Sequence, residues 1–293
     1  MELLKLGEKT YYIKNQTNIG IYKINDKEIY LIDSGNDKEA GKKVLKIIEE
    51  QGWKIKAIIN THSHADHIGG NNIIQERTNC KIYAYGIEKN FIANPILEPV
   101  YLSGAYPFKT LQENKFLMAK PSKVENIENH LPEGLEMFPL KGHFGDMIGI
   151  KTSDDVYFLA DSILSEELVV KHKIFFLYDV AELFKTLDML ENLQGKIYVP
   201  SHAEATNDII PMIQKNREKI NEVIETLLTI CKKSKTFEEI LKEIFDKYQI
   251  KMNENQYVLI GSTIKCYLAY LREQNKISVN FDDNQMKYCT MGK

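Results

Sequence analysis

The stretch Ala57-Ile58-Ile59-Asn60-Thr61-His62-Ser63-His64-Ala65-Asp66-His67 places three of the chain's seven histidines directly after a short apolar run. Neutral imidazole is the commonest metal ligand in proteins, and zinc accepts imidazole nitrogen and carboxylate oxygen together. We therefore interpret residues 61–67 as a metal-binding motif. If the apolar run is a strand and a helix runs from Ile68 onward, the first two histidines share one side of the strand end. The aspartate and the third histidine then lie on the following turn and face a second metal beside the first.

The composition is that of an ordinary soluble globular protein. The 293 residues are 43% hydrophobic and 27% charged, enough for one large domain, or a large domain and a small one. A formal net charge of -3 gives no overall field to attract nucleic acid or an anionic membrane. No apolar run approaches the roughly twenty residues of a membrane span, and the four scattered cysteines suit free thiols in a reducing compartment. We therefore expect a cytoplasmic protein with no membrane partner.

Residues 1–206 alternate strand-like and helix-like segments, the order of an α/β domain. The predicted helices cover residues 38–51 and 181–193, and the predicted strands cover residues 10–14, 19–24, 28–32, 55–60, 135–140, 147–151, 156–160 and 196–199. Residues 86–132 break this pattern, because prolines interrupt a long stretch rich in aromatic residues. So long an irregular stretch is typical of an insertion with a function, and we expect it near the active site.

Residues 207–293 form a second unit of different character. Three helices are predicted, over residues 209–231, from Thr236 onward and over residues 256–273, followed by a hairpin of residues 276–281 and 286–290. The second helix starts with a capping box, and its apolar residues lie on a single face. This order of elements is that of a winged-helix-like α+β module.

Three further candidate ligands each follow a predicted strand. His143 comes after residues 135–140 in a glycine-containing loop, Asp161 ends the strand of residues 156–160, and His202 follows residues 196–199. Strands of one sheet can deliver such side chains to a common point. We therefore expect all of these residues at the same metal site as the histidine motif.

With these pieces in order, residues 11–204 resemble the metallo-β-lactamase-fold hydrolases. The family's signature H-x-H-x-D-H stands as His62, His64, Asp66 and His67, the later motifs match at His143, Asp161 and His202, and Asp33 matches an early aspartate. The resemblance implies a four-layer αββα sandwich with a dinuclear metal site at one edge. By position, it implies one metal on His62, His64 and His143, a second on Asp66, His67 and His202, Asp161 bridging both, and Asp33 orienting a ligand through hydrogen bonds.

The loops depart from those of the best-known enzymes of the family. This chain has Leu-Lys-Gly-His where many members have Thr-Pro-Gly-His, and Ala160-Asp161 where many have Gly-Asp. Antibiotic-degrading relatives generally have cysteine or serine at the position of Asp161, whereas thioesterases, lactonases and phosphodiesterases keep the aspartate. The resemblance therefore places β-lactamase activity below these other reactions.

We accordingly predict a hydrolase that uses two divalent ions to activate water as hydroxide, with Asp66 as the acceptor of the water's proton. Zinc is the preferred metal, and iron or manganese also suits a site of histidines and carboxylates. The predicted substrate is a small thioester, lactone or related ester. The alternatives are a nucleic-acid phosphodiesterase resembling an endoribonuclease and, ranked last, a metal-sensing DNA-binding regulator.

Other residues are candidates for contact with the substrate. Lys171, His172 and Lys173 follow the Asp161 strand and either meet an anionic substrate or form a solvated charged turn. Tyr101 and Tyr106 either line a substrate pocket or anchor the insertion. In the tail, residues 262–272 offer few basic side chains for nucleic acid, so a homodimer contact or a wall over the active site is the preferred role.

Overall fold

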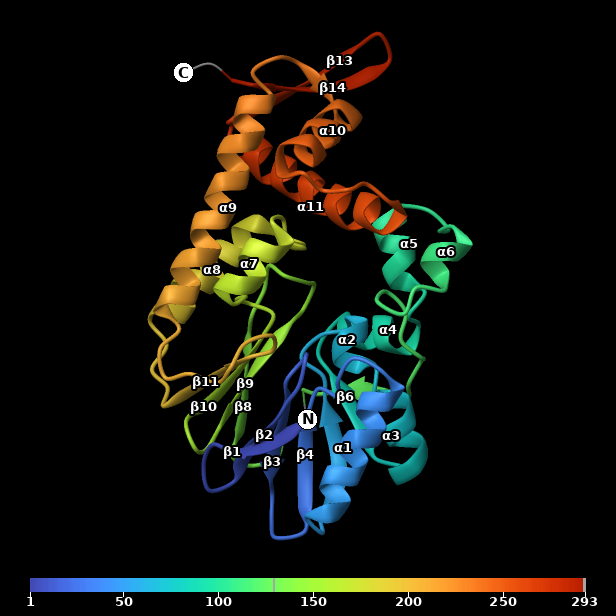
Figure 1. Ribbon diagram of the computed structural model, residues 1–293, viewed down its shortest axis with the longest axis vertical. Helices are drawn as coiled ribbons and strands as arrows, with labels where there is room; N and C mark the ends of the chain where they lie inside the picture. The colour runs from blue at the N-terminus through green and yellow to red at the C-terminus, as the bar shows by residue number, and fades with distance from the viewer. Residues whose placement is uncertain (129, 292–293) are drawn as a thin grey trace.

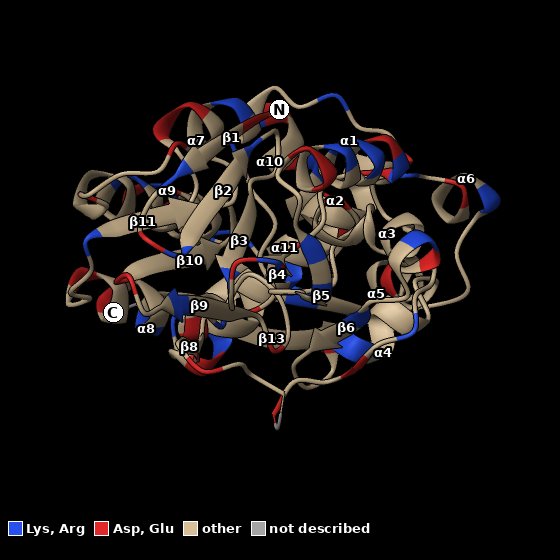
Figure 2. Ribbon diagram, turned by 90° about the horizontal axis from the view of Figure 1, so that it is seen from below, with Lys and Arg blue, Asp and Glu red and all other residues tan. Residues whose placement is uncertain are grey.

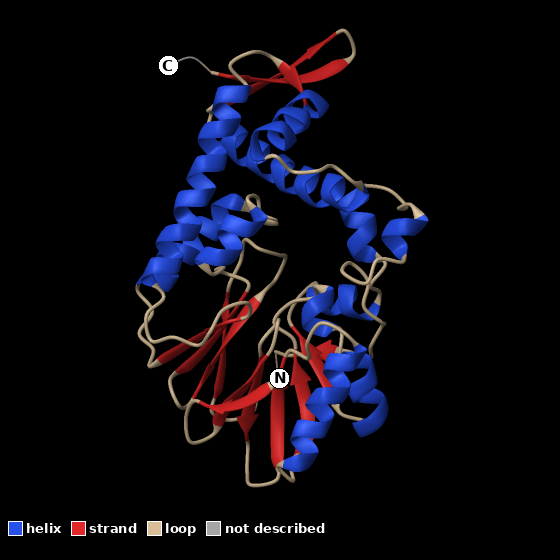
Figure 3. Cartoon of the chain, viewed as in Figure 1, coloured by secondary structure: helices blue, strands red, loops and turns tan. Residues whose placement is uncertain are grey.

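The computed structural model describes residues 1–128 and 130–291, so three residues of the predicted insertion and tail, 129, 292 and 293, lie outside the described residues. Two sheets stand against each other, with helices on their outer faces, and a group of helices with a small sheet follows at one end (Figures 1 and 3). Acidic and basic segments are interspersed over the face shown in Figure 2. No helix among the described residues is both long and apolar enough to cross a membrane.

The first sheet has seven strands in chain order. They are β1 Glu2–Lys5, β2 Thr10–Lys14, β3 Ile19–Lys23, β4 Glu28–Ile32, β5 Lys54–Ile59, β6 Lys81–Ala84 and β7 Glu125–Asn126. Strands β1 to β4 are antiparallel, whereas β4 to β7 are parallel. The carboxyl ends of β4 and β5 therefore meet at one edge, which carries Asp33 and the histidine motif.

Alternating side chains give this sheet two buried faces. In β4, Ile29 and Leu31 pack beneath the outer helices α1 Lys38–Glu50 and α3 Asn71–Thr78, while Tyr30 and Ile32 face the other sheet. Helix α1 begins at Asp37, whose side chain accepts the Ala40 amide at 2.7 Å.

The second sheet has four strands in the order β11-β10-β9-β8. They are β8 Leu135–Pro139, β9 Ile148–Thr152, β10 Val156–Ala160 and β11 Ile197–Pro200. Because β9 is antiparallel to both β8 and β10, and β11 is parallel to β10, strands β8, β10 and β11 all end at one edge. The outer face of this sheet packs against α8 Val180–Glu191 and α9 Ile210–Ile230. The order of layers, helix, sheet, sheet, helix, is the expected αββα sandwich.

The remaining helices surround the edge where the strands end (Figure 1). The insertion contributes α4 Glu88–Ala93, α5 Leu97–Ser103 and α6 Lys109–Gln112, and α7 Glu166–His172 follows β10. The last part of the chain contains β12 Lys235–Thr236, α10 Phe237–Tyr248, α11 Glu254–Glu273, β13 Ile277–Asp282 and β14 Gln285–Thr290, with the sheet order β12-β14-β13.

The hydrophobic core continues across the expected boundary near residue 207. Leu159 of β10, Leu187 of α8, Ile224 of α9 and Ile264 of α11 belong to one cluster of buried side chains. The apolar face of α10 is buried in the same cluster, so the chain covers this face itself, without a second subunit.

The histidine motif differs from the expectation in one respect. Its helix, α2 Ala65–Ile68, already begins inside the motif and ends at Gly69, so a continuous helix from Ile68 onward is wrong. A Cβ at Gly69 would lie 2.4 Å from the Asn36 carbonyl carbon, and one at Gly70 would lie 2.3 Å from the Ser34 carbonyl oxygen. The two glycines therefore let the motif pack directly against the loop that follows β4.

Candidate metal centre

The structure gathers all seven predicted ligands at the edge where the strands of both sheets end. Strand β5 delivers His62 and His64, α2 carries Asp66 and His67, and the ends of β8, β10 and β11 deliver the other three. Their potential ligand atoms form three overlapping groups, and the atoms of each group lie within 4.8 Å of one another. His62, His64 and His143 are called the first set, and Asp66, His67 and His202 are called the second set. The third group, His62, His67 and Asp161, joins the two.

The first set contains only imidazoles. The Nδ1 atom of His64 lies 3.1 Å from Nε2 of His62 and 3.0 Å from Nε2 of His143. Three nitrogens from two loops, one after β5 and one after β8, therefore converge, in an arrangement that can hold one ion on three ligands. Gly142 allows His143 to reach this point, because it has a φ of +119° and a Cβ there would lie 2.5 Å from the Leu183 backbone.

The second set mixes imidazoles with a carboxylate. Asp66 Oδ2 lies 3.3 Å from Nε2 of His202 and 3.7 Å from Nε2 of His67. The Asp66 side chain is 37% exposed, whereas that of His67 is fully buried. Asp66 is therefore the member of this set that faces the open side of the site.

Asp161 lies between the two sets. Its Oδ1 is 3.2 Å from Nε2 of His67, and its Oδ2 is 3.3 Å from Nε2 of His202 and 3.6 Å from Nε2 of His143. One carboxylate thus reaches an imidazole of the first set and two of the second, which is the placement that a bridging ligand needs.

The outer nitrogens of the imidazoles have partners that fix their orientation. Nδ1 of His67 lies 2.8 Å from Asp33 Oδ2, and the Asp33 carboxylate also accepts the Thr61 amide and hydroxyl at 2.8 Å. Nδ1 of His202 lies 2.9 Å from the Gln16 carbonyl oxygen. Such contacts hold each ring with its other nitrogen turned toward the site. The orienting role of Asp33 stays a prediction, and its contact with His67 is where that role would be exerted.

Two residues beside the second set have a left-handed backbone conformation. Asp33 has a φ of 61°, and Ala160, directly before Asp161, has a φ of 48°. A residue with a side chain costs on the order of 1 kcal/mol in this region, and such strain is concentrated at functional sites. The alanine that replaces the family's usual glycine is therefore a strained position next to the shared carboxylate.

The two sets differ in their electrostatics. Burial lowers the pKa of His62, His64 and His143, that of His64 to about 3, so these rings are neutral and able to bind a metal. Burial also lowers the pKa of His202, but the carboxylates of Asp161 and Asp66 outweigh it and raise this pKa to about 10. The carboxylates thus draw positive charge to the second set, as a proton or as a metal ion.

Two buried atoms test whether the site suits a metal. Nε2 of His67 and Oδ1 of Asp161 are both buried, and neither has a hydrogen-bond partner among the described residues. Unpaired buried polar atoms are costly, and these two point at each other across the gap between the sets. A divalent ion would satisfy both, and the donor set of imidazole nitrogen and carboxylate oxygen fits zinc, with iron or manganese also compatible.

Two glutamates at the site were not predicted from the sequence. Glu88 is fully buried and accepts the amides of Ser63 and Asp146 at 2.9 and 2.8 Å, which ties the histidine motif to the His143 loop. Glu98 lies 3.7 Å from Nε2 of His64, and burial raises its pKa to about 8. Both belong to the proline-interrupted insertion, whose irregular sequence gave no signal beyond the two carboxylates themselves.

The predicted substrate residues fall in different places. The Tyr101 ring packs against Phe144, which in turn contacts the His64 ring, whereas Tyr106 is 77% exposed in the loop from α5 to α6. Lys173 donates to the carbonyls of Tyr248 and Gln249 at 2.7 and 3.3 Å, so the structure ties it to α10 instead of the metal centre. Lys171 and His172 lie on the last turn of α7, and burial lowers the pKa of His172.

The comparisons with known proteins identify the family. The family model of the metallo-beta-lactamase superfamily matches residues 12–202, and the chain belongs to this superfamily. A beta-lactamase domain protein from Burkholderia ambifaria has a similar fold, with a TM-score of 0.75 and 15% identity over 99% of this chain and 94% of its own. A metallo-beta-lactamase family protein from Thermus thermophilus also has a similar fold, with a TM-score of 0.69 and 16% identity over 99% of this chain and 98% of its own. At these identities the structures show the fold alone.

Curated relatives match shorter segments. A hydroxyacylglutathione hydrolase from Prochlorococcus marinus is 36% identical over 162 residues, which are 52% of this chain and 56% of that protein. A probable metallo-hydrolase from Bacillus subtilis is 34% identical over 74 residues, which are 25% of this chain and 34% of that protein. The chain thus covers 56% of the length of the first of these curated relatives and 34% of the second.

Proposed function

We propose that this protein is a dinuclear metal-dependent hydrolase, with zinc as the preferred metal, that cleaves a small thioester or a related ester or lactone. The observation that carries the proposal is the position of Asp161, within 3.2 to 3.6 Å of imidazoles from both sets of candidate ligands. In this proposal one ion occupies His62, His64 and His143, a second occupies Asp66, His67 and His202, and Asp161 is shared.

A pair of such ions supplies an activated water molecule and a Lewis acid for the oxygen of the substrate. Side chains of the protein supply proton transfer and the orientation of the ligands. The Asp66 carboxylate takes the proton of the attacking water, because it combines a position at the open side with an ionised state. Burial favours its protonated form, but the positive charge at His67 and His202, carried by protons or by a metal ion in their place, outweighs this and keeps its pKa well below the usual range. Asp33 and Gln16 hold the rings of His67 and His202 in the orientation required.

Two features support a thioester as the substrate. Several curated relatives, including the 36%-identical protein from Prochlorococcus marinus, are hydroxyacylglutathione hydrolases, and this name describes a thioester-cleaving enzyme. The chain also has an aspartate at position 161, where antibiotic-degrading relatives generally have cysteine or serine. We therefore rank β-lactam substrates below thioesters and lactones.

We propose that the end of the chain is a winged-helix-like module. Three helices and three strands follow in the order α9-β12-α10-α11-β13-β14, and β14 lies between β12 and β13 in the sheet. We propose that this module is a wall over the active site. Helix α11 packs against α5 of the insertion, and Glu98 of α5 approaches His64.

A nucleic-acid phosphodiesterase is the second candidate, and the winged-helix connectivity is the observation that favours it. Against it, the α11 helix that would read nucleic acid is partly covered by α5, and Leu268 and Leu271 are buried in the core. The net charge of -3 adds no general attraction for phosphates. A metal-sensing DNA-binding regulator ranks lower still, because seven converging candidate ligands favour a catalytic site over a sensor.

One preparation tests these alternatives. Metal content is measured after loading with zinc, manganese or iron, and the same samples are assayed on an acyl-glutathione thioester, a lactone, a β-lactam, bis(4-nitrophenyl) phosphate and single-stranded RNA. We expect two ions per chain and the highest kcat/KM on the thioester. Cleavage of RNA with no turnover of the thioester or lactone would overturn the proposal in favour of the second candidate.

A further inference from the structure

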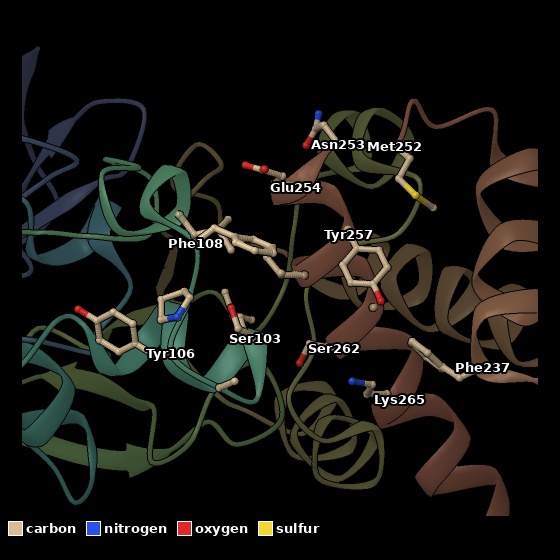
Figure 4. Close-up of a pocket in the computed structure, with 16 residues that line it drawn as sticks. Ser103, Tyr106, Phe108, Phe237, Met252, Asn253, Glu254, Tyr257, Ser262 and Lys265 are labelled. Carbon is tan, nitrogen blue, oxygen red and sulfur yellow. The ribbon is translucent and has the colours of Figure 1, made fainter. Parts of the chain in front are cut away.

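A cavity of about 470 Å³ lies away from the candidate ligands, between the insertion and the winged-helix-like module. Its walls are the end of α5, the loop from α5 to α6, and the first half of α11, with Phe237 of α10 at one side (Figure 4). This volume is within the usual range for a site that binds a small molecule.

The two walls are fixed to each other. Leu102, Leu111 and Leu117 of the insertion share a buried cluster with Val258 of α11. Beside this cluster, Asn114 donates to Asn255 at 2.8 Å, and Thr110 donates to Glu254. The packing and hydrogen bonds between the two walls therefore hold the cavity in a defined shape.

The inside of the cavity is mainly apolar. Four of the large hydrophobic side chains that the structure leaves exposed gather around it, namely Tyr106 at 77%, Phe108 at 72%, Met252 at 47% and Tyr257 at 40%. Exposed apolar groups that cluster at a concave surface mark a binding site more often than isolated ones do. The occupant that such walls stabilise has an apolar chain or ring.

The polar groups of the cavity are divided between its two sides. Figure 4 shows Ser103, Ser262 and Lys265 along one side and Glu254 near the opposite end. The Lys265 ammonium lies 5.0 Å from the centre of the Phe237 ring and forms no ion pair with a described residue. The Ser103 hydroxyl is buried without a described hydrogen-bond partner. A ligand with one acidic group fits the Lys265 side.

We propose that this cavity binds an amphipathic acid, with its carboxylate at Lys265 and its apolar part between Phe108 and Tyr257. Contacts along α5 link one wall of the cavity to the metal centre. Ser262 donates to the Tyr101 hydroxyl at 3.4 Å, and α5 carries Glu98 at its first turn, 3.7 Å from His64. An occupant that contacts the end of α5 therefore acts on the helix that flanks the His64 ring.

Calorimetric titration of the metal-loaded protein with decanoate tests the site without any turnover, so its result is independent of the proposed hydrolase. Decanol is the matched probe without charge, and excess acetate occupies any carboxylate site on the metals. We expect Lys265→Gln to weaken decanoate binding about tenfold and to leave decanol binding unchanged. Lys247→Gln, an exposed lysine of α10 outside the cavity, is the control and should bind decanoate like the wild type.

A second variant fills the cavity. A Cβ at Gly261 would meet its nearest neighbours at 3.7 and 3.8 Å, so Gly261→Leu can extend into the cavity from an accommodating position. It should abolish binding of both probes while metal content and circular dichroism stay as in the wild type. Equal decanoate affinity in the wild type and Lys265→Gln, or binding that acetate removes entirely, would overturn the proposal whatever the outcome with Gly261→Leu.

Discussion

The two sets of candidate ligands share one site but are built differently. His62, His64 and His143 are imidazoles whose pKa values burial lowers, so they are ready to bind a metal without losing a proton. The second set combines the imidazoles of His67 and His202 with the carboxylate of Asp66 and lies beside that of Asp161. These two carboxylates raise the pKa of His202 to about 10. It follows that a metal ion must displace a proton to bind at the second set, whereas metal binding at the first set depends on the geometry of the rings.

The largest effect is expected from Asp161→Ala, because its carboxylate contacts both sets. Metal content should fall from two ions per chain to one or fewer, and kcat should fall by on the order of a thousandfold. Elemental analysis and steady-state assays on the same samples measure both. Two tightly held ions with unchanged kcat in this variant would show that the sets are independent.

A smaller loss is expected from Asp66→Ala. Since Asp66 is the proposed acceptor of the water's proton, kcat should fall by roughly a hundredfold while KM changes little. The assay is run with saturating metal, so that weaker binding at the second set does not add to the effect. A rise in KM with kcat preserved would make Asp66 a residue of substrate binding instead.

Paired substitutions outside the ligands compare the two sets directly. Asp33→Asn should weaken metal binding at the second set by about ten- to a hundredfold, since Asp33 lies 2.8 Å from His67. Glu98→Gln, at 3.7 Å from His64, should affect the first set less. Competitive titration with a chelator gives both affinities. Equal losses in the two variants would contradict the proposed ranking of these contacts.

The smallest effect concerns stability. Ala160→Gly should raise the free energy of unfolding by about 1 kcal/mol, because glycine adopts the left-handed backbone of this position without strain. Urea unfolding of the metal-free protein measures the change, and Ala84→Gly, at a buried strand residue, should destabilise instead. A destabilised Ala160→Gly protein would mean that the alanine methyl group contributes more packing than its backbone costs.

Much of the fold followed from the pattern of side chains. Alternation in the first strands and the apolar faces of α1 and α10 predicted their positions within a residue or two. The short edge strand β1 was not predicted, because four residues of strand give weak periodicity. Helix α3 covers only residues 71–78 of the helix that was expected from Ile68 onward. Helix α2 was misplaced, since a single turn has no period to detect.

The sequence by itself determined which residues could bind metal, because the histidine motif concentrates a scarce residue type and the other candidates follow strands. Only the tertiary structure decided their grouping, since parallel and antiparallel pairing sets which strand ends meet. It also decided the placement of Glu88, Glu98 and the cavity beside Lys265. These depend on how an irregular insertion packs on a distant helix, and contacts between segments so far apart in the chain leave no local pattern for the sequence to show.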